Sequence, residues 1–424
     1  MSIYLKNATF IDWETFEFSN VDIEVGNGID GKLTFFPPNS EMPTDTHSID
    51  CTGKYVTKSL AVGHHHVYSA LARGMPAPAK IPTNFPEILK YVWWNLDKNL
   101  DKDTIEASAL ATAIDCAKNG ATFAIDHHAS PNAVKGSLEI IAKAFDKVGV
   151  SHLLCYEISD RDGLDLAKQG IEESEEYLKK NQALVGLHAS FTVGNTTMKM
   201  AVGLAEKYDT GIHMHVAEDT YDQHFCWEHY KTSVVGRLNE FGILSRSKSI
   251  LVHCLHLDEQ ERRLLQNSPA WIVQNMESNL KNKVGFFDSK GLGNNIMLGT
   301  DGMHSDMIRS TKAAYFVGQN FDSINDKHAY NRLRNVHRYL SENNFKGDGE
   351  NNLIVLDYQP PTNFHSGNFL GHFIFGWESK HIQHVISNGN LIVKDRKTTN
   401  VDEQETLAKV REMSLKLWQK LSAK

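Results

Sequence analysis

Short apolar segments alternate with charged, amphipathic stretches through the middle of the chain. Eight such segments are Ser59–Gly63, Ala121–Asp126, Val150–Glu157, Ala183–Leu187, Gly211–His215, Ile250–Cys254, Ala270–Gln274 and Asn295–Gly299. Most are followed by helix-like sequence, for example Leu100–Lys118, Asn132–Lys147 and Ile171–Lys180. This alternation is typical of parallel strands with crossover helices, and eight units predict a (β/α)8 barrel. The last two strands lie close together in the sequence, so we expect a short or irregular connection between them.

The two ends of the chain show a different pattern, with short strand-like runs and turn signals. The runs are Ile3–Phe10, Val21–Val25, Leu353–Tyr358 and Ile382–Val393. Asn388-Gly389 marks a turn within the last of them. We expect both ends to meet as one small β-sandwich, followed by a helix over Asp402–Leu421. The predicted domains are therefore 1–58 and 351–424 for the sandwich, and 59–350 for the barrel.

Composition narrows the class of protein. The 424 residues are enough for a barrel with a smaller module. A net charge of −8 argues against a nucleic-acid polymer as partner, because phosphate binding needs a basic surface. No apolar run approaches the ~18–20 residues of a membrane helix. Met1–Asp12 lacks the basic start and apolar core of a signal peptide, so we expect a cytoplasmic protein. Five scattered cysteines without a C-x-x-C pair argue against a disulfide framework or a cysteine-based zinc site.

Histidines cluster at the end of the first predicted barrel strand. In Gly63-His64-His65-His66, the side chains of His64 and His66 point to the same face of the strand, and His65 points the other way. Because barrel enzymes carry their chemistry at the C-terminal ends of the strands, this pair of imidazoles can bind a divalent metal there. For this motif alone, three chance histidines in a polar loop remain the alternative.

Three further strand ends carry groups suited to metal-assisted hydrolysis. His215 and Glu218 follow the fifth strand, where a metal ligand and a proton-carrying carboxylate would share one pocket. His213 is expected to be a buried structural residue. His253 ends the sixth strand and can polarise a water or a substrate oxygen, and Asp301 ends the eighth and can bind a metal and accept a proton. Each has a structural alternative, but their coincidence at strands one, five, six and eight favours a catalytic site.

This pattern resembles the amidohydrolase superfamily, in particular its one-metal deaminase and chlorohydrolase branch. The residues that carry the resemblance are His64-x-His66, His215-x-x-Glu218, His253 and Asp301. The resemblance covers nearly the whole chain, including the split β-module at the two ends. It implies a distorted (β/α)8 TIM barrel and one zinc or iron ion per subunit.

The resemblance also implies a role for each of these residues. Glu218 would shuttle protons, and His253 would position and polarise the attacking water or the substrate. Asp301 would act both as a ligand and as a catalytic group. The implied metal ligands are His64, His66, His215 and Asp301.

Other runs resemble the aminohydrolases of the SsnA group. These runs are Tyr68–Gly74, Trp93–Asp97, Asp126–Pro131 and Ser278-Asn279. The fourth strand ends in His188, where two-metal members of the superfamily have a bridging lysine, so the resemblance implies one metal and a substrate contact for His188. The chain departs from the pattern at Lys58–Gly63, Gly349–Leu353 and Gln274–Asn279, which affects loop geometry but none of the implied ligands.

Strand ends and the long first loop supply the candidate substrate contacts. These are Tyr68, Arg73, Trp94, His127, His128, Glu157, Arg161 and His188. Barrel loops often carry specificity, but each residue also has a structural reading, for example a loop ion pair between Arg73 and Asp160 and packing for Trp94. Both signs of charge are present, which suits a heterocycle with an amino group and a carbonyl.

The leading expectation is a metal-dependent aminohydrolase that acts on C–N bonds other than peptide bonds. Its partner would be a small heterocycle of the purine, pterin, pyrimidine or triazine type, with ammonia as the leaving group. One alternative is hydrolysis of a ring C–N or C–Cl bond without deamination. Another is a barrel without catalysis that serves as a binding or scaffold protein. No membrane partner is expected, and a homo-oligomer is left open.

Overall fold

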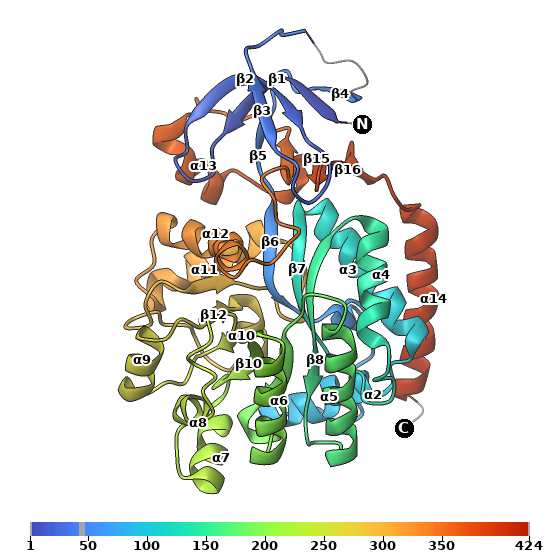
Figure 1. The fold of residues 1–424 in the computed structure, drawn as a ribbon, viewed down its shortest axis with the longest axis vertical. Coiled ribbons are helices and arrows are strands. Elements are labelled where there is room, and N and C mark those ends of the chain that lie inside the picture. The colour runs from blue at the N-terminus through green and yellow to red at the C-terminus, as the bar shows by residue number, and fades with distance from the viewer. Residues whose placement is uncertain (1, 42–46, 423–424) are drawn as a thin grey trace.

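Two β-sheets and the helices around them make up the fold of the computed structural model (Figure 1). The structure describes residues 2–41 and 47–422. Met1, residues 42–46 and residues 423–424, which belong to the predicted end modules, lie outside the described residues.

Eight parallel strands form the central sheet and follow one another in sequence order, which confirms the predicted barrel. They are β6 (Leu60–His65), β7 (Ala121–His128), β8 (Ser151–Ile158), β9 (Val185–Ala189), β10 (Ile212–Val216), β11 (Ile250–His253), β12 (Trp271–Gln274) and β13 (Ile296–Leu298). The ring closes just beyond β13, where the amide of Thr300 donates to the carbonyl of His64 at 2.9 Å. His65 and Asp301 pair in a parallel bridge at the same place. Closure of the barrel therefore brings Asp301 beside the first-strand histidines.

Helices connect the strands on the outside of the barrel (Figure 1). They are α3 (Lys102–Lys118), α4 (Ser137–Val148), α5 (Leu164–Leu178), α6 (Asn195–Lys207), α7 (Thr220–Tyr230), α8 (Val234–Glu240), α9 (Glu259–Gln266) and α10 (Met276–Asn282). After the last barrel strand, α11 (Met307–Phe321) and α12 (Asp326–Glu342) lead to the second sheet. The connection between β12 and β13 holds only the seven-residue α10, as its short length predicts. Helix α4 begins at Ser137 rather than at Asn132, because Gly136 adopts a left-handed φ of 79° that a continuous helix does not allow.

Helix α12 closes the N-terminal end of the barrel. Its residues Val336, Tyr339 and Leu340 belong to the same buried cluster as the inward-pointing strand residues, such as Phe123 and Trp271. The Tyr339 hydroxyl donates to the carbonyl of Lys248 at 2.8 Å, just before β11 begins. With this end filled, the opposite, C-terminal end is left for a functional site.

Both chain ends build the second sheet, as predicted. Its strands are β1 (Ile3–Ile11), β2 (Phe18–Val25), β3 (Leu33–Phe36), β4 (His47–Asp50), β5 (Tyr55–Lys58), β14 (Leu353–Leu356), β15 (Ile382–Ser387), β16 (Asn390–Lys394) and β17 (Lys397–Thr398). Hydrogen bonds link them into one nine-stranded sheet, because β1 pairs with β2 on one side and with β4 and β5 on the other. Antiparallel pairing of β5 with β14, with Val56 opposite Val355, joins the two ends. The predicted turn at Asn388-Gly389 has φ values of 48° and 74°, as a tight hairpin requires.

The remaining C-terminal elements pack against both parts. Helix α13 (Phe369–Phe375) lies under the second sheet, and α14 (Glu403–Ser422) runs along the outside of the barrel next to α3 (Figure 1). Strand β5 ends at Lys58 and β6 begins at Leu60, where the sequence places the first domain boundary. The domain limits 1–58, 59–350 and 351–424 themselves stay a prediction.

Two further findings concern membrane-spanning helices and the state of the cysteines. Within the described ranges, no helix combines the length and apolar character needed to cross a bilayer. All five cysteines are free and buried.

A buried ion network connects the second sheet to the barrel. The Lys58 ammonium lies 2.9 Å from the Asp348 carboxylate, and His337 Nδ1 lies 2.7 Å from its other oxygen. Burial alone would raise the pKa of Asp348, but the charges of His337 and Lys58 and their hydrogen bonds hold it well below the usual value. This network connects the end of β5, the middle of α12 and the loop before β14.

Replacing Asp348 with Asn should therefore destabilise the fold. The Lys58 ammonium would stay buried without a counter-charge, which typically costs ~3–5 kcal/mol of the free energy of unfolding. Because the folded pKa of Asp348 lies below its unfolded value, its contribution is present above the unfolded pKa and is lost as the pH falls. Urea unfolding at several pH values should show a smaller acid sensitivity for the variant than for the wild type.

The exposed pair Lys179–Glu176 provides the matched control. Glu176→Gln should change the free energy of unfolding by less than ~1 kcal/mol, because solvent screens exposed pairs. An equally small change for Asp348→Asn would contradict a stabilising role for the buried network.

Candidate active site

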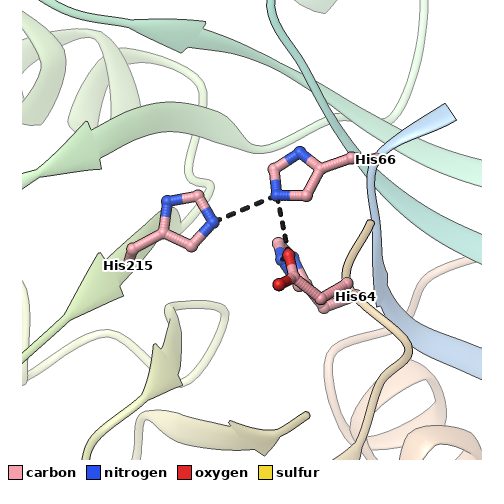
Figure 2. A group of neighbouring side chains, drawn as sticks. His64, His66 and His215 are labelled. Carbon is pink, nitrogen blue, oxygen red and sulfur yellow. Dashed lines mark hydrogen bonds and ion pairs between the residues drawn. The ribbon is translucent and has the colours of Figure 1, made fainter. Parts of the chain in front are cut away.

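Three histidines and one aspartate meet at the C-terminal end of the barrel strands (Figure 2). His64 and His66 come from the end of β6, His215 from β10, and Asp301 from the segment after β13. Nε2 of His66 lies 3.2 Å from Nε2 of His215 and 3.0 Å from Oδ1 of Asp301. Nε2 of His64 lies 3.2 Å from the same oxygen. His65 points away, as expected, with its Nδ1 2.9 Å from the Thr300 hydroxyl.

The outer ring nitrogens of two of these histidines are held by backbone carbonyls. His66 Nδ1 donates to the carbonyl of His127 at 2.6 Å, and His215 Nδ1 donates to the carbonyl of His188 at 3.0 Å. These bonds place each proton on Nδ1 and leave a bare lone pair on Nε2. The two Nε2 atoms and the carboxylate of Asp301 thus face one another as acceptors, which requires a proton or a cation between them.

His64 is oriented by a second layer of side chains. Its Nδ1 shares a hydrogen bond of 2.9 Å with Nε2 of His213, whose Nδ1 lies 3.5 Å from the sulfur of Cys155. His213 is fully buried behind the cluster. His213 therefore orients the ring of His64, a candidate metal ligand, from the side away from the cluster.

The donor set fits a divalent metal of the zinc type. Three neutral imidazoles and one carboxylate are common ligands of zinc and related ions. Burial lowers the pKa of His66, but the hydrogen bond and charge of Asp301 and two further carboxylates outweigh it and raise the pKa to about 9. The cluster thus stabilises a positive charge at the point where its ligand atoms converge.

Glu218 and His253 lie beside this cluster. His253 Nδ1 donates to Oδ1 of Asn279 at 2.9 Å, which leaves Nε2 facing Oε2 of Glu218 at 3.4 Å. Burial raises the pKa of Glu218 well above the usual value, and the charge of Asp301 raises it further. Burial also lowers the pKa of His253. The carboxyl group of Glu218 can therefore hold a proton next to a neutral imidazole.

The backbone at these strand ends is strained. Four residues other than glycine have a positive φ: Ala217 at 47°, His253 at 72°, Cys254 at 52° and Asp301 at 51°. Such values are uncommon for residues with a Cβ and cluster at functional sites. These positions lie at or next to the strand ends that carry Glu218, His253 and Asp301.

A cavity of about 480 Å³, partly open to solvent, lies in front of the cluster. Its walls come from several strand ends and from the long first loop, which contains α1 (Phe85–Ile88), η2 (Leu89–Trp93) and α2 (Trp94–Lys98). The lining residues are His66, Tyr68, Phe85, Leu89, Trp93, Trp94, Glu157, Arg161, His188, His215, Glu218, Asn282, Asp301 and Gly302. The mixture of aromatic and polar walls suits a small planar molecule.

Five of the predicted substrate contacts line this cavity: Tyr68, Trp94, Glu157, Arg161 and His188. The Arg161 guanidinium lies 5.1 Å from the ring centroid of Trp94. It also pairs with the buried Asp97 and lies 3.6 Å from Glu157. Positive charge, negative charge and an indole ring are thus combined on one wall.

The other three predicted contacts do not line the cavity. His127 is buried beneath it, with Nδ1 3.2 Å from Glu157 and Nε2 3.1 Å from the carbonyl of His213. His128 is buried against the hydroxyl of Ser130 at 3.0 Å. Arg73 turns outward, and its half-exposed side chain pairs with Asp115 on α3 at 2.7 Å. Arg73 thus forms an ion pair, as in its structural reading, but with Asp115 and not with Asp160.

Several cavity residues carry no signal of a site in the sequence. Phe85, Leu89 and Trp93 belong to the first loop, where no apolar periodicity distinguishes them. Asn282 lies one helical turn after Ser278 on α10, so a helical reading of that stretch would have placed both on one face.

Comparison with known proteins agrees with this geometry. The family model described as "Amidohydrolase family" matches residues 63–347. A relative named 5-methylthioadenosine/S-adenosylhomocysteine deaminase, from Aquifex aeolicus (strain VF5), is 28% identical over 412 residues, covering 89% of this chain and 90% of that protein. The chain belongs to the amidohydrolase family.

Two solved structures share the fold along almost the whole chain. One is an adenosine deaminase from Xanthomonas campestris with bound zinc, with a TM-score of 0.83, 17% identity and 98% of both chains covered. The other is the atrazine chlorohydrolase TrzN from Arthrobacter aurescens TC1 complexed with zinc, with a TM-score of 0.81 and 14% identity. That match covers 97% of this chain and all of the other. These likenesses confirm the amidohydrolase TIM-barrel architecture.

Replacing His66 with Ala should remove most of the bound metal, since a ligand atom near both His215 and Asp301 is deleted. The measurement is metal content per folded subunit by mass spectrometry. His65→Ala is the matched control, because His65 is the neighbouring buried histidine that points away from the cluster. Equal metal content in the two folded variants would contradict this assignment.

Proposed function

We propose that this protein is a metal-dependent hydrolase that removes an amino group, as ammonia, from an amino-substituted N-heterocycle. The observation that carries the proposal is the convergence of four ligand atoms next to a buried carboxyl group at the wall of a cavity. The name of the Aquifex relative supports deamination as the reaction. The expected substrates are heterocycles of the purine, pterin, pyrimidine or triazine type.

We infer that one divalent ion per subunit is held by His64, His66, His215 and Asp301. Zinc is proposed over iron because zinc is bound in both solved structures described above. Such a metal would lower the pKa of a bound water molecule to roughly 7–9. The end of β9 supports a single ion, because His188 and not a lysine stands there.

The protein's own groups then move the protons. We assign acceptance of a proton from the attacking water to Asp301 or His253, and this assignment is supported by their positions beside the converging ligand atoms. Glu218 delivers its proton to the ring nitrogen beside the reacting carbon, takes up the proton of the hydroxyl group that has added to that carbon, and passes this proton to the departing amine. The first water proton, held by Asp301 or His253, then returns to Glu218 and restores its carboxyl group. Water supplies the oxygen that stays on the ring and a proton that leaves with the amine, so ammonia and a carbonyl product result.

The cavity wall is proposed to bind the ring. Trp94 and Tyr68 offer aromatic surface, whereas Glu157, Arg161 and His188 offer donors and acceptors for the ring substituents. His127 and His128 lie behind this wall, and we assign them a supporting role. A cytoplasmic location and the oligomeric state stay predictions.

A panel of amino-substituted purines, pterins, pyrimidines and triazines, incubated with the zinc-loaded protein, tests the proposed function. Ammonia release from at least one class is expected. Chloride release from chloro-substituted analogues without ammonia release from their amino counterparts would favour the alternative hydrolysis. No turnover of any compound by fully loaded protein would favour a binding protein.

Replacing Glu218 with Gln should leave the metal in place and lower kcat by ~10²–10⁴-fold, because a general acid–base group is lost while the ligand atoms remain. Steady-state kinetics and metal analysis on the same preparation check this. A variant with kcat near that of the wild type would show that another residue carries the proton, and His253 is the next candidate.

Replacing Arg161 with Lys keeps the positive charge but loses the planar pair of donors. If Arg161 binds substrate, kcat/KM should fall roughly 5- to 150-fold, with unchanged metal content. Arg73→Lys is the matched control, since Arg73 lies outside the cavity. Equal kcat/KM values for the two variants would show that Arg161 does not bind the substrate.

A further inference from the structure

Helix α10 presents three polar side chains to three different groups of the proposed reaction centre. Ser278 donates to Oδ2 of Asp301, and Asn279 accepts from His253. One turn further along, Asn282 reaches Glu218. The last contact involves a residue to which neither the motifs of the sequence nor the comparisons assign a role.

Asn282 holds the oxygen of Glu218 that His253 does not face. Its Nδ2 lies 3.5 Å from Oε1 of Glu218 and 3.5 Å from the hydroxyl of Ser278. His253 faces the other oxygen, Oε2. Hydrogen bonds of this kind are often long without substrate and shorten in the reacting complex.

The side-chain oxygen of Asn282, Oδ1, is free to bind another molecule. Asn282 is buried, with 8% of its surface exposed, and lines the cavity. Its Oδ1 has no hydrogen-bond partner among the residues that the structure describes. A buried acceptor without a partner is unfavourable, so a donor on a molecule in the cavity is the natural partner.

We propose that Asn282 connects Glu218 to the substrate. Its Nδ2 positions Oε1 of Glu218 for proton delivery. Its Oδ1 accepts a hydrogen bond from an N–H or amino group next to the ring nitrogen that Glu218 protonates. The enzyme therefore prefers heterocycles with such a donor over otherwise identical rings without it. This inference rests on the proposed function and narrows its substrate class.

The test replaces Asn282 with Leu, which is similar in size and has no polar side-chain atom. Zinc-loaded wild type and variant are assayed with paired substrates that differ only in the neighbouring donor, such as 2,6-diaminopurine against adenine and matched aminotriazines. The wild type should prefer the donor-bearing member in kcat/KM by about fivefold or more, as expected for one hydrogen bond to a buried group. The variant should lose this preference, and its kcat should fall about 10- to 100-fold with unchanged metal content.

Asn343→Leu is the matched control. Asn343 is a buried asparagine at the end of α12, and its Nδ2 donates to the carbonyl of Tyr339 at 3.0 Å. Its replacement should lower the melting temperature but leave kcat and the substrate preference unchanged. A purely structural role for Asn282 would give this same result in Asn282→Leu and would overturn the inference.

Crystal structures of the zinc-loaded wild type and Asn282→Leu give a readout that does not depend on activity. Glu218 should turn away from its wild-type orientation in the variant, and an unchanged Glu218 together with an unchanged preference overturns the inference. Failure of the proposed function looks different, because the wild type would then release no ammonia from any member of the panel. If the wild type releases no ammonia, the crystal structures still test the positioning of Glu218. A Glu218 side chain that has rotated in Asn282→Leu would support positioning by Asn282, and an unchanged one would refute it.

Discussion

The convergence of acceptor atoms that need a positive charge between them is the constraint on which the rest of the site depends. The Nε2 atoms of His66 and His215 face each other at 3.2 Å, and both approach the carboxylate of Asp301. Acceptors at this distance are stable only around a positive charge. The protein must therefore hold them together by forces that come from outside the cluster.

Three parts of the fold supply those forces. Backbone carbonyls of neighbouring strands fix the outer nitrogens of His66 and His215, so each ring is oriented by the barrel itself. Closure of the barrel after β13 holds Asp301 next to His64, and α12 fills the opposite end so that the strands keep their places. Helix α10 then orients the groups that carry protons, through Ser278 and Asn279.

Much of the fold and of the metal cluster could be predicted from the sequence. The spacing of apolar residues indicates the strands, and the position of a polar residue at the end of a strand indicates its place in the site. The eight apolar runs became eight strands, and the alternation of side chains along β6 placed His64 and His66 together and His65 apart. The contrast between Arg73 and Arg161 could not be predicted. Both follow barrel strands, yet one pairs with α3 at the surface and the other lines the cavity, and only the path of the loops decides between them. The aromatic walls from the first loop and the unpaired end of Asn282 also depend on tertiary packing, which no local pattern records.

The ligand atoms of Asp301 and of the three histidines labelled in Figure 2 should surround a single metal ion. An anomalous diffraction map, recorded at the zinc absorption edge from crystals of protein purified without chelator, tests it most directly. One peak per subunit is expected, within about 2.0–2.2 Å of Nε2 of His64, His66 and His215 and of a carboxylate oxygen of Asp301. No anomalous peak between these side chains after zinc loading, or two peaks bridged by a shared ligand, would contradict it.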